Sequence, residues 1–208
     1  MDYTVVDKSG KKVKDITLND AIFGLKFNKT LVYEAVLVER ANKRAGLSFF
    51  KNRAMVTATG KKLYRQKGTG YARHGAKSSN IFVGGGSAFG DQRHNYSRSM
   101  PKKMKKKAIF TLLSLYADKE KIKILDSLIS ENGKTKEIFS VLSDVVNLDK
   151  KVLLISEHGN ALLKQAVGNI KNVQFIDYKQ LNVLSVFQAN EILTDVSVIE
   201  KMNSLVEG

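Results

Sequence analysis

Apolar residues recur at helical spacing in two segments that flank a long irregular region. The first segment begins at Asn28, a residue suited to cap a helix, and a helix is expected to run to about Ala45 and stop at Gly46. Its apolar stripe consists of Leu31, Ala35 and Val38, with Val32 and Val36 beside them. The second helix is expected to open at Ser99 and Pro101. Its apolar stripe is Met104, Ala108, Leu112 and Leu115.

The rest of the chain alternates between strand-like and helix-like patterns. Runs rich in β-branched residues predict strands at Asp2–Val6, Ile122–Leu125, Val152–Ile155, Val173–Ile176 and Glu191–Leu193. Helical patterns fall near Lys134–Val145, Asn160–Val167 and Val196–Val206. This alternation predicts an α/β fold, a globular three-layer-like body with a mostly parallel sheet. Residues 1–45 and 100–208 are expected to form this domain together, with residues 46–99 inserted in it as an extended basic loop.

The positive charge of the chain is concentrated in one third of its length. Residues 40–107 carry 18 Lys and Arg against a single acid, Asp91, whereas residues 1–39 are neutral and residues 108–208 have a net charge of −2. Eight of the 15 glycines lie between Gly60 and Gly90, where apolar residues follow no regular period. Such a segment needs a polyanion or water to screen it. We expect residues 46–99 to be mostly disordered in the free protein and to order on binding.

Composition excludes several classes of protein. A hydrophobic content of 43% over 208 residues is typical of globular proteins, and the absence of Cys excludes a disulfide scaffold or a Cys-based zinc ribbon. The N-terminal residues lack the pattern of a secretory signal, and no run of about 18 apolar residues predicts a membrane span. We expect a cytoplasmic protein with no cofactor, no metal and no membrane contact.

The motifs of common enzymes are incomplete. The run that starts at Gly68 has Arg73 where a dinucleotide fingerprint requires its third Gly, and the run that starts at Gly84 has Phe89 there. No P-loop, HExxH or GxSxG motif occurs. His158 follows a predicted strand and is a weak catalytic candidate, for which a surface or capping role is the simpler interpretation. The sequence therefore predicts no enzyme and no catalytic residue.

Residues 61–75 interleave cations, aromatic rings and glycines, a pattern typical of RNA binding. The cations neutralise phosphates, which makes binding dependent on salt. Tyr64, Tyr71 and His74 offer rings on which splayed bases of single-stranded RNA can stack, and the Arg65 guanidinium can do the same. Three glycines let the backbone approach sugar and phosphate closely: Gly68, Gly70 and Gly75.

Other interpretations of this region stay open. A disordered, solubilising loop would have the same composition, whereas the glycine content disfavours a membrane-surface helix. The run Lys102–Lys107 fits either a solvated helix face or an RNA contact, and its lysines oppose the dipole of the helix that they begin. The triple glycine Gly84–Gly86 fits either a hinge or a close backbone contact with RNA.

The run from Lys61 to Gly75, with its core RQKGTGYAR, closely resembles the signature loop of universal large-subunit ribosomal protein four in its bacterial form. Further matches follow in order along essentially the whole chain: Phe23-Gly24, Asn52-Arg53-Ala54, Gly84–Gly90, Pro101–Met104 and Lys134–Lys136. The resemblance implies a structural RNA-binding protein of the large ribosomal subunit, located in the cytoplasmic ribosome and without enzymatic activity. Its α/β body would lie on the large ribosomal RNA.

The resemblance also implies roles for individual residues. In the family, the loop threads inward and its tip helps line the constriction of the nascent-peptide exit tunnel, and the resemblance implies the same here. The reach of the chain allows it, because about 50 residues folded back on themselves span at most about 80 Å. Lys67 matches the family position at which changes alter macrolide susceptibility. The implied tip is Arg65, Gln66, Lys67, Gly68, Thr69 and Gly70. The rest of the expected RNA-binding set is Lys51, Arg53, Lys61, Lys62, Tyr64, Arg73, His74, Lys77, Arg93, Arg98, Lys102, Lys103 and Lys106.

The sequence departs from the family pattern at the loop. Many bacterial relatives have Pro-Trp where this chain has Leu63-Tyr64, and many have Arg where it has Tyr71. Leu63 has a backbone N–H that Pro lacks, so the local path is expected to differ slightly, and Tyr64 keeps a stacking surface.

The expected partners are large-subunit ribosomal RNA, neighbouring large-subunit proteins and the nascent peptide near the loop tip, with no homo-oligomer. Some family members repress their own operon through its leader transcript, and the sequence leaves open whether this chain does. Two alternatives are an enzyme that uses the basic loop as an RNA clamp and a regulatory RNA-binding protein outside the ribosome.

Overall fold

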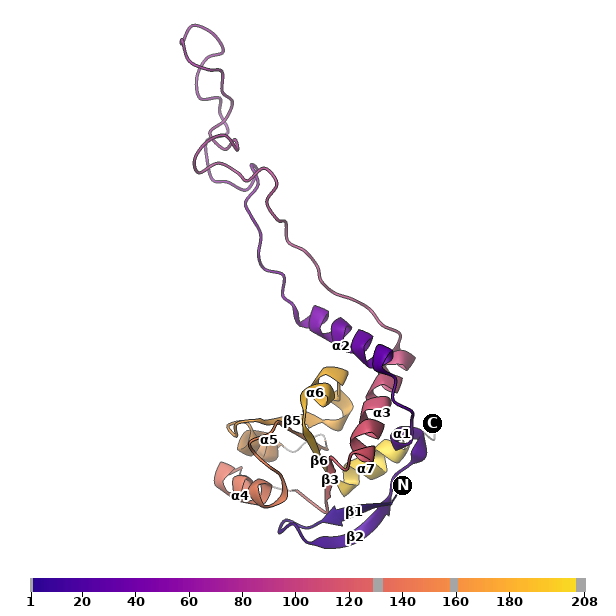
Figure 1. Cartoon of the computed structure of the whole chain (residues 1–208). Coiled ribbons are helices and arrows are strands. Elements are labelled where there is room, and N and C mark those ends of the chain that lie inside the picture. Colours follow the sequence, from indigo (N-terminus) through magenta and orange to yellow (C-terminus); the bar gives the residue numbers. More distant parts are fainter. Residues whose placement is uncertain (1, 129–132, 158–160, 205–208) are drawn as a thin grey trace. The chain divides into compact units, whose positions relative to one another are not determined.

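The computed structural model describes residues 2–128, 133–157 and 161–204. The chain divides into two compact units, one made of Met1–Ala41 with Arg98–Gly208 and the other of Asn42–Ser97. Every helix and strand begins in the first unit, which we call the α/β body (Figure 1). We call the second unit the basic unit.

The α/β body is built on a six-stranded sheet in the order β2-β1-β3-β6-β4-β5. The strands are β1 (Asp2–Val6), β2 (Lys12–Thr17), β3 (Ile122–Leu125), β4 (Val152–Ser156), β5 (Val173–Asp177) and β6 (Glu191–Asp195). Only the β1–β2 pair is antiparallel, and all other neighbours run parallel. The predicted α/β class with a mostly parallel sheet is confirmed.

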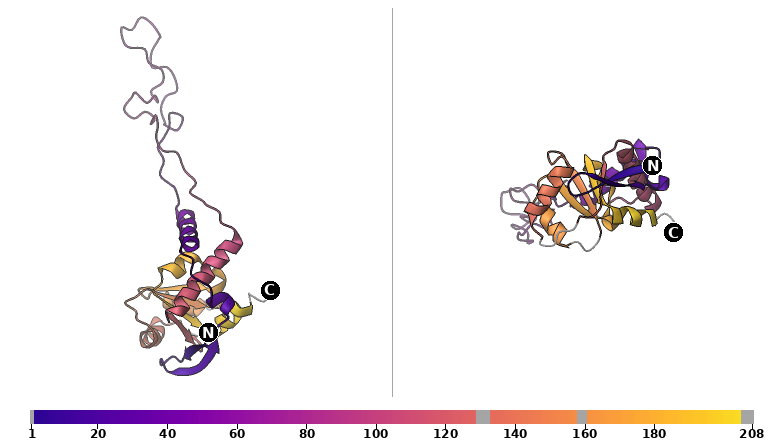
Figure 2. Two further views of the ribbon diagram at one scale, coloured as in Figure 1. Left: turned by 45° about the vertical axis from the view of Figure 1, so that its right-hand side comes forward. Right: turned by 90° about the horizontal axis from the view of Figure 1, so that it is seen from below.

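The strands alternate their side chains between two hydrophobic cores, one on each face of the sheet. In β4, Leu153 and Ile155 belong to one core, whereas Val152 and Leu154 belong to the other. Helices α4 (Thr135–Val145) and α5 (Ala161–Val167) supply the second core, and the first core receives the remaining α-helices. Figures 1 and 2 show the sheet between these two helical layers. Because both faces are covered, the central strand β4 is buried along its whole length and is apolar at four of its five residues.

All five predicted strands and all five predicted helices are present. Helix α2 (Lys29–Lys43) begins after Asn28, whose side-chain oxygen accepts from the Leu31 N–H at 3.1 Å, so the predicted cap is confirmed. It ends before Gly46, whose φ of +60° belongs to the left-handed region. Three further predicted helices are present as α4, α5 and α7 (Val196–Ser204), and α3 is described below. Val206, in the predicted last helix, lies outside the described residues.

Helix α3 (Lys102–Asp118) begins where predicted, but its buried face differs from the predicted stripe. Ala108 and Leu112 are buried, whereas Met104 is exposed in the lysine-rich first turns. Ser114, which the predicted stripe leaves out, is buried. Its hydroxyl is satisfied there, because it donates to the Ile22 carbonyl at 3.0 Å and accepts from the Leu25 N–H at 3.0 Å. These bonds tie α3 to the end of α1 (Asp20–Phe23).

Three short elements escaped the sequence prediction besides β2: helix α1, the 3-10 turn η1 (Tyr178–Gln180) and helix α6 (Val183–Gln188). The first turn of α6 is held by Glu39 of α2, whose carboxylate accepts from the backbone N–H groups of Val183 at 3.0 Å and Leu184 at 2.7 Å. A side chain 144 residues away in sequence thus satisfies the helix terminus.

Candidate nucleic-acid interface

The basic unit contains no helix or strand between residues 44 and 97, all of which are described. Its 11 Lys and Arg face a single acid, Asp91, and all 11 are exposed. Only three of its residues are buried: Ala76, Ser78 and Gly86. With so little burial and no ion pair within residues 42–97, its own contacts leave nearly all of its positive charge facing outward.

The residues of the signature loop lie together in one narrow turn. The backbone pairs at Lys62 and Ala76, and the Leu63 N–H donates to the Gly75 carbonyl at 3.1 Å. The backbone N–H of Leu63 is therefore used to close the loop. Between these paired ends lie Tyr64, Arg65, Gln66, Lys67, Gly68, Thr69, Gly70, Arg73 and His74.

The tip of this loop turns through two glycines and an arginine. Arg65 donates from Nη2 to the Gly68 carbonyl at 2.9 Å, and the Lys62 ammonium donates to the Gln66 side-chain oxygen. Gly68 and Gly70 have φ values of +80° and +75°, a region that favours glycine. The tip thus leaves the Lys67 side chain exposed.

Aromatic rings form a cluster behind the tip. The Tyr64 ring lies 6.4 Å from Tyr71 and 6.2 Å from His74, and His74 lies 5.0 Å from Phe82, all between ring centroids. The Tyr64 hydroxyl donates to the Ala72 carbonyl. Tyr71 is 79% exposed, so one ring face is open to a nucleic-acid base. Sequence reasoning did not identify Phe82, which supports His74 from outside the signature.

The triple glycine makes a close backbone contact within its own chain, and a contact of the same glycines with RNA stays a prediction. The Gly86 N–H donates to the Ser78 carbonyl at 3.1 Å, and a Cβ at Gly86 would lie 2.5 Å from the Arg53 nitrogen. The next residue donates to the Lys51 carbonyl at 3.0 Å. Gly86 therefore packs against residues 51–53 and serves as a close backbone contact within the basic unit. The Gly86–Ser87 segment thus contacts both residues 51–53 and Ser78, the neighbour of Lys77 in sequence.

Two arginines near the ends of the basic unit stack on aromatic rings. Arg93 lies over the Phe49 ring at 4.6 Å, and Arg44 lies over the Tyr96 ring at 3.7 Å. Arg93 belongs to the predicted set, whereas Arg44 and its ring partner do not. The remaining predicted cations belong to the α/β body: Arg98 precedes α3, and Lys102, Lys103 and Lys106 lie in its first two turns. That helix has no acidic residue in its first turn.

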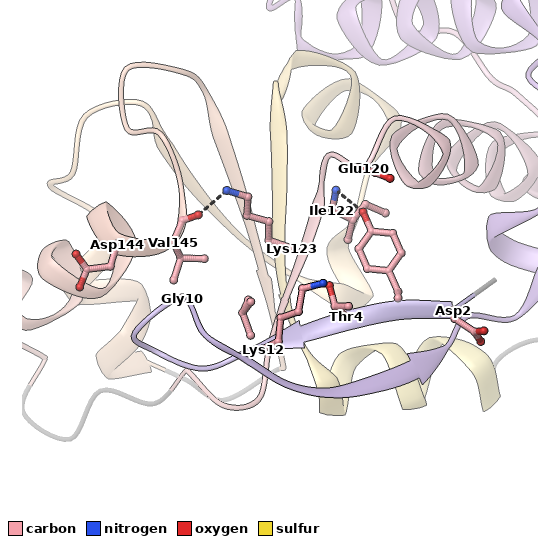
Figure 3. Close-up of a pocket in the computed structure, with 11 residues that line it drawn as sticks. Asp2, Thr4, Gly10, Lys12, Glu120, Ile122, Lys123, Asp144 and Val145 are labelled. Carbon is pink, nitrogen blue, oxygen red and sulfur yellow. Dashed lines mark hydrogen bonds between the residues drawn. The ribbon is translucent and has the colours of Figure 1, made fainter.

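The α/β body offers a pocket of about 460 Å³ but no catalytic constellation (Figure 3). Its carboxylates come from separate elements, with Asp2 and Asp144 on opposite sides of the opening. The Lys123 ammonium donates a hydrogen bond to the Val145 carbonyl. Within the described part of the chain, no group of three His, Asp or Glu is placed to hold a metal, and no helix is long and apolar enough to cross a membrane. His158 lies outside the described residues.

Comparison with known proteins identifies the family of this chain. The model of the ribosomal protein L4/L1 family matches residues 16–205. The chain belongs to this family. It is 33% identical over 204 residues to the large ribosomal subunit protein uL4 of Borreliella burgdorferi, with 98% of each chain covered. The protein of the same name from Treponema denticola is 35% identical over 193 residues, with 93% of this chain and 91% of the relative covered.

Membership of this family makes the chain a structural protein of the large ribosomal subunit, located in the ribosome. The predicted resemblance is confirmed, and so is the prediction that the protein is not an enzyme, since the family is one of structural components. The residue roles that the resemblance implies stay predictions.

Proposed function

We propose that the basic unit binds large-subunit ribosomal RNA and anchors the α/β body on it. The observation that carries this proposal is the set of 11 exposed cations, with no ion pair within the described residues 42–97. An array of exposed cations without internal counterions gains free energy from a polyanion, because bound phosphates release condensed counterions. Exposed apolar side chains of the same unit, including Val83 and Phe89, lose water when RNA or neighbouring proteins cover them.

The tip from Arg65 to Gly70 is proposed to line the nascent-peptide exit tunnel, as the family resemblance implies. Its narrow closure at Lys62 and Ala76 and its two left-handed glycines support this role, since they allow a slender loop to enter a confined space. Lys67, exposed at the tip, is the residue at which a change is expected to alter macrolide susceptibility. Repression of the protein's own operon would use the same cations on a leader transcript.

Sucrose-gradient fractionation of a cell lysate tests the proposed RNA binding. We expect the protein to sediment with the large subunit at moderate salt and to remain there at high salt, because many phosphate contacts distributed along the chain must break together before it dissociates. Release by mild ribonuclease treatment should accompany loss of the RNA. Recovery in the soluble fraction at both salt concentrations would refute the proposal and favour a regulatory protein outside the ribosome.

Limited proteolysis tests whether the basic unit orders on RNA. Cleavage of the free protein is expected to concentrate within residues 46–99, where three buried residues offer little resistance to opening. Bound to a transcript of 23S-type ribosomal RNA, the same residues should resist cleavage, while the α/β body resists in both states. A free protein that is resistant throughout residues 46–99 would contradict coupled folding and binding.

A further inference from the structure

Two segments without helix or strand enter and leave the basic unit: residues 44–50 form the outgoing leg, and residues 91–97 form the returning leg. The two legs are joined by reciprocal arginine–aromatic stacks. Arg44 of the outgoing leg lies over Tyr96 of the returning leg, 3.7 Å from guanidinium carbon to ring centroid. Arg93 of the returning leg lies over Phe49 of the outgoing leg at 4.6 Å. Each leg thus supplies one arginine and one ring, and the arginines are exposed while the rings are half-buried.

Backbone packing holds the legs in this register. A Cβ at Gly46 would lie 2.4 Å from the His94 carbonyl oxygen, so only glycine allows the outgoing leg to approach so closely. The His94 ring also contacts the Tyr96 ring, with 4.6 Å between centroids and 73° between the ring planes. At the second stack the Phe50 N–H donates to the Asp91 carbonyl at 2.9 Å.

A stacked guanidinium keeps its hydrogen-bonding edge free. The ring contacts one face of the planar group, whereas its N–H donors point outward in the plane and match two phosphate oxygens at once. Neither Arg44 nor Arg93 has a carboxylate partner within residues 42–97, all of which the structure describes. Stacking also limits the rotamers of a long side chain, which lowers the entropy lost when a ligand binds.

We propose that Arg44 and Arg93, each held on a ring of the opposite leg, form a clamp for the phosphodiester backbone of RNA. The proposal rests on the proposed RNA-binding function and specifies a part of it. The clamp recognises phosphate oxygens and not bases, because its rings are already covered by the arginines. It requires arginine at both positions, since lysine has no planar face to stack and offers only a point charge.

The test compares charge-conserving substitutions in the full chain, with a transcript of 23S-type ribosomal RNA as the probe. Arg44→Lys and Arg93→Lys are each expected to weaken binding by roughly 5- to 10-fold, the loss typical of one net hydrogen bond, because lysine keeps the charge but not the second planar N–H contact. The dependence of affinity on salt should stay the same, because lysine still neutralises a phosphate. Arg40→Lys is the matched control, an exposed arginine of α2 outside the basic unit with no stacking partner among the described residues, and should change affinity by less than about 2-fold.

Removing the ring tests the stack itself. Tyr96→Leu keeps every charge and should weaken binding as much as Arg44→Lys, and the double variant should be no weaker than either single variant. Losses of affinity that multiply in the double variant, or an Arg44→Lys variant that binds like Arg40→Lys, would overturn the clamp while native binding remained. Failure of the native protein to bind the transcript would instead refute the proposed function on which the clamp depends.

Discussion

Replacing the cations of the signature loop with alanine is expected to weaken binding to 23S-type ribosomal RNA by roughly 100-fold at moderate salt, if each cation contributes about 0.7 kcal/mol. The variant combines Lys61→Ala, Lys62→Ala, Arg65→Ala and Lys67→Ala. These side chains are exposed and have no carboxylate partner within the basic unit, so the substitutions remove charges that would neutralise phosphates. The slope of log affinity against log salt should fall in magnitude by about 0.7–0.9 for each phosphate that the variant no longer neutralises.

A control with the same change in net charge separates local contact from general attraction. Four exposed lysines of the α/β body can be replaced with alanine together: Lys8, Lys11, Lys164 and Lys171. This variant should bind RNA within about 3-fold of the native protein, because a Debye length near 10 Å confines each charge to its surroundings. Equal losses of affinity in both variants, or an unchanged salt slope in the loop variant, would mean that the loop cations do not touch phosphate.

The sequence predicts the central strands of the sheet well because β3, β4 and β6 are largely buried on both faces. In β4 all five residues are buried, so the run of apolar residues is a direct signal. Strand β2 lacks this signal, since five of its six residues are exposed and it is held at the edge of the sheet by pairing with β1. Helix α6 has six residues without a clear period, and its first turn depends on Glu39. Such elements are specified by tertiary contacts that no local pattern carries.

The candidate interface also has features that the sequence predicts and features that it does not. The positive charge of the interface and the turn at residues 61–75 can be predicted from the sequence, because the glycines and cations that make them are contiguous. The stack of Arg44 on Tyr96 joins residues 52 positions apart in segments that have no periodicity. The interleaving of arginine with aromatic residues in both legs is the only local sign of it. Which arginine meets which ring depends on the register of the legs, which Gly46 permits.

A buried carboxyl group in the α/β body predicts a pH-dependent stability. Asp195 ends β6 and is 6% exposed, and it accepts a hydrogen bond from the Ser156 hydroxyl at 3.1 Å. Burial raises the pKa of Asp195 from 3.8 to about 6, although the Ser156 bond and a backbone bond from Leu128 oppose the shift. Because the folded state holds this proton more tightly than the unfolded chain, the group stabilises the fold below pH 4. This stabilisation disappears as the pH rises through about 6.

The expected size of this effect is about 3 kcal/mol, since a shift of about two pKa units corresponds to that free energy. Urea denaturation of the native protein and of Asp195→Asn, followed by circular dichroism from pH 4 to pH 7, measures it. The free energy of unfolding of the native protein should fall relative to the variant as the pH rises, because Asn cannot ionise. Asp118→Asn, at an exposed carboxylate at the end of α3, controls for removal of a charge and should leave the pH profile unchanged. Parallel profiles for the native protein and Asp195→Asn would show that this carboxyl group titrates alike in the folded and unfolded states, and that burial at the end of β6 does not penalise its charge.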